Sequence, residues 1–112
     1  MITLYGIKNC DTVKKARRWL EDHGTDYHFH DFRQDGLDKK LLTQWVETSG
    51  WETLVNKRST TWRNLPDTDK NISSNQQAIT LLLANPTLIK RPVTIKNKTI
   101  LIGFKEDEFK VL

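Results

Sequence analysis

Tyr5-Gly6-Ile7-Lys8-Asn9-Cys10-Asp11-Thr12 places the only cysteine of the chain between an apolar run and an amphipathic one. The run from Ile2 to Tyr5 before it predicts a strand, and residues 13–23 after it predict a helix. Cys10 is therefore expected at a strand-to-helix turn, where the free N–H groups and the positive end of the helix dipole favour a thiolate. Because the thiolate is the reactive form of cysteine, the sequence predicts a nucleophile at this turn.

The residues that follow complete a strand–helix–strand unit. Asp11 and Thr12 are both capping types for the start of the helix, and Gly24 is a typical end signal. Residues 26–32 alternate between aromatic and polar types, which predicts a second strand. A unit of this length predicts two parallel strands with a right-handed crossover, the first of them central because it is apolar on both faces. The polar face of the second strand is expected to carry His28, His30 and Asp31.

The rest of the chain predicts a block of helices and then a hairpin. In chain order we expect a turn at Asp35-Gly36, a helix over 38–48, a short helical turn over 51–55, a polar basic loop over 56–63, a charged linker over 65–72 and a helix over 73–85. Two strands over 93–96 and 99–102 are joined by Asn97-Lys98, which suits a tight hairpin turn, and a short helix over 106–111 closes the chain. The order is βαβ, helices, then ββα.

Length and composition restrict the class of protein. The chain has 112 residues, 37% of them hydrophobic, enough for one folded domain. No apolar run approaches the roughly 18–20 residues of a membrane span, and the first residues lack the pattern of a secretory signal. One cysteine forms no internal disulfide, so a cytoplasmic location is expected. The net charge of +4 is spread along the chain without aromatic–basic interleaving, which makes nucleic acid an unlikely partner.

Three motifs together resemble the ArsC-like family, which comprises arsenate reductases, Spx-type regulators and YffB-type proteins. They are YGIKNCDTVKKA over 5–16, NKRSTTWR over 56–63, and Lys90-Arg91-Pro92. The resemblance covers essentially the whole chain and is closest to the YffB branch. It implies an α/β protein of thioredoxin-like fold with a mixed four-stranded sheet. Residues 1–36 and 90–112 would form its core, and residues 37–89 a helical insertion.

The resemblance implies that Cys10 is the catalytic nucleophile of a glutathione-dependent thiol-disulfide oxidoreductase. With no second cysteine, the thiol that resolves a mixed disulfide must come from outside, and glutathione is the expected co-substrate. Glutaredoxin is a further expected partner, the substrate is expected to be a small thiol or an oxyanion, and no tightly bound cofactor is expected. In this fold the proline at position 92 is cis and faces the cysteine.

Six further residues are predicted to bind glutathione or substrate. An ammonium group at Lys8 would favour the thiolate, and the planar fork of Arg91 could hold a carboxylate through two hydrogen bonds. Lys8, Arg58 and Arg91 also have a plainer interpretation as solvated surface residues. Thr12 could equally be a helix cap, and Pro92 has a structural role under either interpretation. Lys57 and Arg63 are weaker candidates for the rim of the same cleft. The six are Lys8, Asn9, Thr12, Arg58, Arg91 and Pro92.

Several positions depart from the family pattern. Asn56 and Gly103 stand where arsenate reductases of this type have two of their three arginines, and Gly6 replaces a histidine. Arsenate reduction is therefore the weaker variant of the enzyme hypothesis. Val13 replaces the second cysteine of the Spx-type Cys-x-x-Cys pair, so an intramolecular redox switch is absent. The alternative from another class is a non-enzymatic, Spx-like regulatory protein that contacts the transcription machinery.

No metal site is predicted. His28 and His30 would share one strand face, but no third ligand is evident, so these residues and His23 are interpreted as solvent-facing. The four tryptophans are interpreted mainly as core residues. Trp62 is the exception, because its loop is expected near the cleft.

Overall fold

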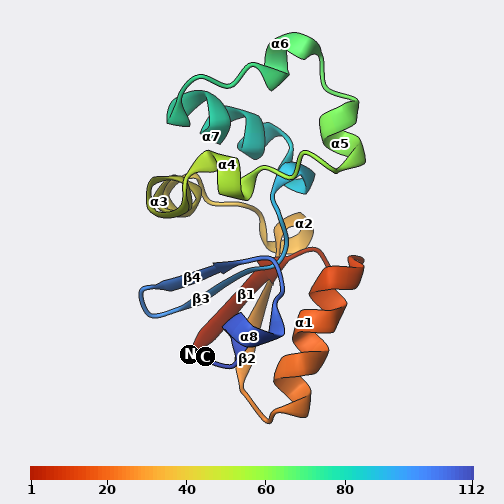
Figure 1. The fold of residues 1–112 in the computed structure, drawn as a ribbon, viewed down its shortest axis with the longest axis vertical. Helices are drawn as coiled ribbons and strands as arrows, with labels where there is room; N and C mark the ends of the chain where they lie inside the picture. The colour runs from red at the N-terminus through yellow and green to blue at the C-terminus, as the bar shows by residue number, and fades with distance from the viewer. The chain divides into compact units, whose positions relative to one another are not determined.

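Four strands form one mixed sheet in the order β2-β1-β3-β4. The computed structural model describes residues 1–112 and bounds the strands as β1 (Ile2–Gly6), β2 (Tyr27–Asp31), β3 (Val93–Lys96) and β4 (Thr99–Ile102) (Figure 1). β1 pairs parallel with β2 and antiparallel with β3. The expected βαβ…ββα arrangement, with the first strand inside the sheet, is confirmed.

The chain divides into two units. The sheet unit comprises Met1–Gly36 and Arg91–Leu112, and the helical unit comprises Leu37–Lys90. None of the helices has the length and apolar character that a membrane crossing requires.

The core of the sheet unit lies between the sheet and two helices, α1 (Asp11–Asp22) and α8 (Glu106–Phe109), which cover the same face of the sheet (Figure 1). α1 presents Val13, Ala16 and Leu20 to that face because these residues recur at helical spacing. The buried cluster consists of Ile2, Leu4, Val13, Ala16, Leu20 and Phe109.

The ends of α1 and β2 differ from expectation. The N-cap of α1 is Cys10, not Asp11 or Thr12, and both of these residues lie within the helix. β2 ends at Asp31, and Phe32 begins a one-turn helix, α2 (Phe32–Asp35). Asp31 is buried, not solvent-facing as the alternating pattern indicated, because its carboxylate caps α2 and turns inward.

The helical unit contains α3 (Lys39–Ser49), α4 (Trp51–Leu54), α5 (Thr60–Arg63), α6 (Asp67–Lys70), α7 (Asn75–Ala84) and the 3-10 turn η1 (Pro86–Leu88). The predicted basic loop and charged linker were wrong in part, since they contain α5 and α6. Helices of one turn are too short to display a hydrophobic period, so periodicity did not detect them. α3 and α7 pack on each other and provide the buried residues Leu42, Trp45, Val46, Ala78, Ile79 and Leu82.

Candidate active site

One edge of the sheet collects the chain segments that carry most of the predicted site residues. Gly6 at the end of β1 pairs with Asp31 at the end of β2, and Tyr5 pairs with Val93 at the start of β3. The cysteine loop (residues 7–10) therefore leaves β1 at this edge, and the dipeptide Arg91-Pro92 enters β3 at the same edge. The N–H of Gly103 donates to the carbonyl of Pro92 at 2.8 Å, so the end of β4 also reaches this edge.

Cys10 begins α1 without using its side chain as a cap. Its backbone is extended, with φ −138° and ψ 124°, and its carbonyl accepts from the N–H of Lys14 at 2.9 Å. The thiol makes no capping hydrogen bond, and the side chain is half-buried against the core cluster. A half-exposed thiol at a helix start with no structural hydrogen bond is available for nucleophilic chemistry.

Gly6 and Val13, the two positions where the family pattern has a histidine and a second cysteine, lie in close contact in this structure. A Cβ atom added at Gly6 would lie 2.7 Å from Cγ2 of Val13, which is far inside van der Waals contact. The end of β1 therefore approaches the first turn of α1 too closely for any side chain at position 6 while valine occupies position 13. Gly6 thus sets how the cysteine loop leaves the sheet.

Lys8 and Asn9 form an exposed bend before Cys10, and Thr12 is exposed on the first turn of α1. The backbone N–H of Lys8 donates to Oδ2 of Asp31 at 3.2 Å. Lys8, Asn9 and Thr12 are therefore exposed residues beside Cys10 at the edge described above.

Asp31 is the residue of this edge that sequence reasoning missed. Its side chain is 4% exposed and accepts from the N–H groups of Lys8 and of Arg33, the latter at 2.8 Å. Burial alone would raise the pKa of Asp31, but backbone hydrogen bonds from Arg33, Lys8 and Gln34 and the charge of Arg33 together hold this pKa below its usual value. The available signal was an acidic residue at the end of a strand predicted parallel to the strand before the cysteine.

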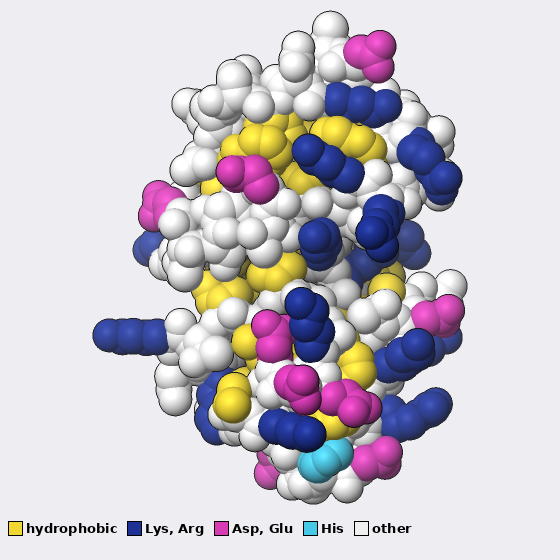
Figure 2. Space-filling view, in the orientation of Figure 1, with side chains coloured by type: hydrophobic (Ala, Val, Ile, Leu, Met, Phe, Trp, Pro, Cys, Tyr) yellow, Lys and Arg dark blue, Asp and Glu magenta, His cyan; other side chains and the backbone are white.

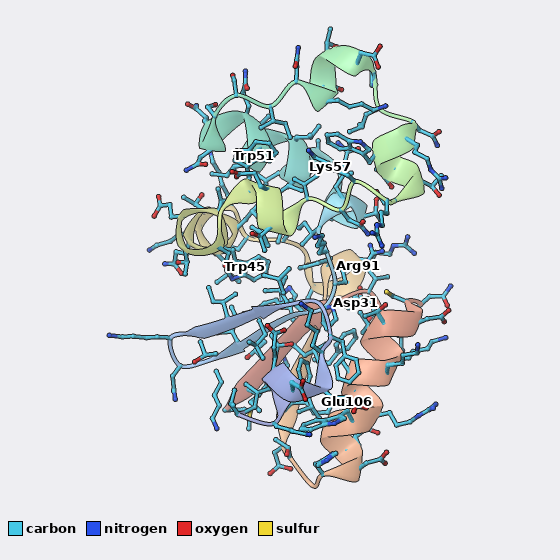
Figure 3. All side chains as sticks on the ribbon, viewed as in Figure 1. Asp31, Trp45, Trp51, Lys57, Arg91 and Glu106 are labelled. Carbon is cyan, nitrogen blue, oxygen red and sulfur yellow. The ribbon has the colours of Figure 1, made fainter.

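The Arg91-Pro92 peptide bond is cis, which confirms that expectation. Pro92 is buried and Arg91 is half-buried. Figure 3 labels Arg91 and Asp31, both at the edge of the sheet that carries the cysteine loop. Arg33, at the start of α2, adds an exposed cation beside this edge that was not predicted as a site residue.

Arg58 belongs to the helical unit, unlike the other predicted site residues. It is exposed, and its backbone N–H donates to Oδ1 of Asn56 at 3.1 Å. Ser59 then caps α5 by accepting from the N–H of Trp62. The turn is anchored within its own unit because the N–H of Asn56 donates to the carbonyl of Leu88 at 2.7 Å.

The helical unit holds a lysine between two aromatic rings, a contact that the sequence analysis did not predict. The ammonium of Lys57 lies 5.8 Å from the ring centre of Trp51 and 5.5 Å from that of Trp62. Figure 3 labels Trp51 and Lys57, which face each other in this unit. Trp51 and Trp62 are half-buried, so neither is a core residue in the sense that Trp45 is.

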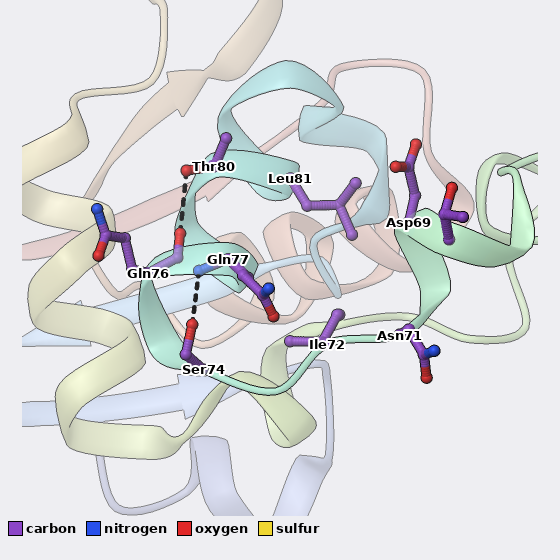
Figure 4. A pocket seen from close by; sticks show the side chains of 9 residues that line it. Asp69, Asn71, Ile72, Ser74, Gln76, Gln77, Thr80 and Leu81 are labelled. Atoms are coloured by element: carbon purple, nitrogen blue, oxygen red, sulfur yellow. Dashed lines mark hydrogen bonds between the residues drawn. The ribbon is translucent and has the colours of Figure 1, made fainter.

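A pocket of about 580 Å³ lies in the helical unit, between α6 and α7. Figure 4 shows its lining, including the hydrogen bonds from the N–H of Gln77 to Ser74 and from the hydroxyl of Thr80 to the carbonyl of Gln76. Its lining contains one titratable side chain, Asp69, and none of the predicted site residues. This pocket therefore offers no thiol and no pair of titratable groups.

The histidines take separate roles. His30 is half-buried, with its Nε2 2.7 Å from the carbonyl oxygen of Gly36 and its ring tilted against Tyr5 at 4.9 Å. His23 stacks on Trp19 with ring centres 3.8 Å apart. No three side chains of His, Cys, Asp or Glu gather in a way that could hold a metal ion. On the face drawn in Figure 2, cationic and acidic side chains are interspersed over the sheet unit.

Comparison with known proteins places this geometry in a family. The model of the ArsC family matches residues 5–112. An uncharacterized protein of Haemophilus influenzae is 56% identical over 109 residues, covering 97% of this chain and 96% of that protein. The global transcriptional regulator Spx of Streptococcus mutans is 32% identical over 98% of this chain and 81% of its own length. A solved structure named YFFB protein superposes with a TM-score of 0.95 at 43% identity, covering 99% of this chain and 97% of that one. The chain belongs to the ArsC family.

Proposed function

We propose that this protein is a glutathione-dependent thiol-disulfide oxidoreductase in which Cys10 is the nucleophile. The observation that carries the proposal is a single half-exposed thiol at the start of α1, with no hydrogen bond that gives it a capping role. A cysteine used only for packing would be buried, and one used only as a cap would bond the first-turn N–H groups. Cys10 does neither.

The reaction proceeds through one mixed disulfide. The Cys10 thiolate attacks the glutathione sulfur of a mixed disulfide substrate, the new S–S bond forms, and the substrate thiolate leaves. A glutathione thiolate then attacks the glutathione sulfur held on Cys10. Oxidised glutathione leaves and the Cys10 thiolate is restored. Glutathione is the reductant: each cycle consumes one reduced glutathione, and the oxidised glutathione that leaves contains this molecule and the glutathionyl group taken from the substrate.

An external resolving thiol is required because the chain has no second cysteine. Val13, at the position where a Cys-x-x-Cys pair would place the second thiol, is fully buried. The protein therefore has no route to an intramolecular disulfide, and its oxidised form is an adduct.

The cations at the same edge suit an anionic co-substrate. Lys8, Arg33 and Arg91 come from three segments that meet at the edge of the sheet that carries Cys10. Glutathione carries two carboxylates, and guanidinium groups bind carboxylates through paired hydrogen bonds. Asn9, Thr12 and Pro92 complete the proposed binding residues in this unit, with Arg58 proposed from the helical unit.

The test begins with oxidised glutathione and intact-mass measurement. We expect one glutathione adduct per chain in the native sequence and none in Cys10→Ser. Turnover is then followed with a glutathionylated peptide, reduced glutathione and coupled glutathione reductase. The absence of an adduct on folded native protein would overturn the proposal.

Arg91 provides the binding arm of the same experiment. Arg91→Gln is expected to raise KM for glutathione about tenfold, as loss of a charge-assisted carboxylate contact costs about 1.4 kcal/mol. Lys98→Gln, in the β3–β4 hairpin, removes one positive charge far along the strand and serves as the matched control. An equal KM in the two variants would remove Arg91 from the site.

A second candidate function is a regulatory binding protein, favoured by the similarity to Spx over nearly the whole chain. It predicts that partner binding survives Cys10→Ser. Arsenate reduction is the weaker variant of the enzyme proposal, since Asn56 and Gly103 leave the family's arginine set incomplete. Adding arsenate to the coupled assay with glutaredoxin tests it directly, and we expect no glutathione oxidation above the arsenate-free rate.

A further inference from the structure

We propose that Asp31 is a positioning residue for Cys10, because its buried carboxylate holds the backbone of the cysteine loop against the end of β2. The inference deepens the proposed function, on which it rests, by naming a residue that acts on the nucleophile without touching the substrate. Nothing in the family motifs of the sequence points to Asp31.

The two oxygens of the carboxylate serve different segments. Oδ2 accepts from the N–H of Lys8, two residues before Cys10, at 3.2 Å. Oδ1 accepts from the N–H of Arg33 at 2.8 Å and so caps α2. The backbone N–H of Asp31 itself donates to Oδ2 of Asp35 at 3.0 Å, which fixes the residue from its other side.

The carboxylate is buried and does not form an ion pair. Asp31 is 4% exposed, and its hydrogen-bond donors Lys8 and Arg33 reach it through backbone N–H groups. A buried charge is tolerated when N–H groups satisfy it, and hydrogen bonds to an ionised acceptor are stronger than neutral ones. The lowered pKa of Asp31 means that the carboxylate is ionised at neutral pH and accepts both hydrogen bonds at full strength.

The loop has few other restraints. Beyond the strand ladder, the hydrogen bond from Lys8 is the one that ties residues 7–9 to a neighbouring strand, and the buried side chain of Ile7 is the other anchor. Cys10 follows directly and starts α1 in an extended conformation. Releasing the Lys8 N–H would let the loop move and would displace the thiol from the N-terminal end of α1, where the helix dipole attracts negative charge.

The experiment compares Asp31→Asn with Asp31→Ala. Asparagine is an equally good helix cap and can still accept from Arg33, but its second terminal atom is then an N–H donor that faces the N–H of Lys8. Asp31→Asn therefore removes the loop contact and keeps the cap, while Asp31→Ala removes both. Asp38→Asn is the matched control, because Asp38 caps α3 of the helical unit through the N–H of Lys40.

The readouts are the rate of Cys10 alkylation by iodoacetamide at pH 7 and the NMR shift and exchange rate of the Lys8 amide. We expect both Asp31 variants to slow alkylation about two- to fivefold, the size of a helix-terminus effect on a charged group, and to release the Lys8 amide. Asp38→Asn is expected to change neither. Native alkylation in Asp31→Asn, or an unchanged Lys8 amide, would overturn the proposal.

Two further features keep the result decisive. Iodoacetamide needs no glutathione, so a native protein that forms no glutathione adduct contradicts the proposed function and leaves the Asp31 comparison intact. If the Asp31 variants do not fold, Lys8→Pro removes the N–H donor while Asp31 remains, and Lys8→Gln controls for the lost charge. Equal alkylation rates in those two variants would also overturn the proposal.

Discussion

Each unit contains a turn that leads into a helix, and the side chain of the N-cap residue is used differently in the two turns. Cys10 precedes α1 and Ser59 precedes α5, and both have extended backbones. The hydroxyl of Ser59 accepts from the N–H of Trp62 at 3.1 Å and donates to the carbonyl of Asn56 at 2.8 Å. The thiol of Cys10 makes no such bond, and its loop is held instead by the carboxylate of Asp31.

The two turns differ in whether the N-cap side chain itself stabilises the turn. At Ser59 the cap side chain stabilises its own turn, so it is occupied. At Cys10 the carboxylate of Asp31, from the neighbouring strand, bonds the loop, and the cap thiol makes no structural hydrogen bond. A turn that needs a reactive cap must therefore obtain its stability from elsewhere in the fold.

The largest expected effect comes from replacing the N-cap cysteine of α1 with serine, the residue type that caps α5. Cys10→Ser should abolish adduct formation and glutathione turnover completely. The same change should raise the free energy of unfolding by about 0.5–1 kcal/mol, because serine is a better N-cap. Denaturant unfolding and the coupled assay measure the two effects, and a variant that retains turnover would contradict the role of Cys10.

The next largest effect is expected from a side chain at Gly6, which should lower the stability of the turn before α1. Gly6→Ala is expected to lower stability by about 1–3 kcal/mol, because the new Cβ would meet Cγ2 of Val13. Val13→Ala in the same chain should recover part of the loss, which a double-mutant cycle measures by chemical denaturation. Additive losses would show that the two positions do not compete for space.

Removing the cap of the second turn should cost less and leave the chemistry untouched. Ser59→Ala is expected to lower the free energy of unfolding by about 1 kcal/mol, the typical value of an N-cap. Cys10 alkylation should proceed at the native rate. If alkylation changed, the two turns would not be independent.

The smallest expected effect is the loss of stability at low pH that follows from protonation of Asp31. Because the pKa of Asp31 is lower in the folded chain than its usual 3.8, its contribution to stability is present above that value. The contribution is lost as the pH falls through the folded-state pKa. Below pH of about 4, the native protein should therefore lose stability more steeply than Asp31→Asn. Urea unfolding at a series of pH values measures both slopes, and parallel curves would contradict the assignment.

Elements with a clear period could be predicted from the sequence. Residues 13–23 and 73–85 have the spacing that burial on one face of a helix imposes, and residues 2–5 form a short run that is apolar on both faces. Each forms the expected element. Cys10 could be placed because it stands between two such elements.

The remainder depends on partners that are distant in the sequence. Asp31 is buried only because its strand pairs in parallel with the strand before the cysteine loop, and a local pattern does not show a hydrogen bond to Lys8. Lys57 meets Trp51 and Trp62 through the fold of a turn whose helices are one turn long. Such contacts carry no periodic signal.

The insertion between β2 and β3 also determines when the candidate site can exist. β1 leaves the ribosome first, but its antiparallel partner β3 begins at Val93, after the whole helical unit has been made. Long-range pairings of this kind form late, because the intervening chain must be closed before the strands can meet. The edge that carries Cys10 is therefore completed only after β3 has been synthesised. Until β3 is made, a nascent chain holds the thiol of Cys10 without Arg91, Pro92 or the central pairing of the sheet.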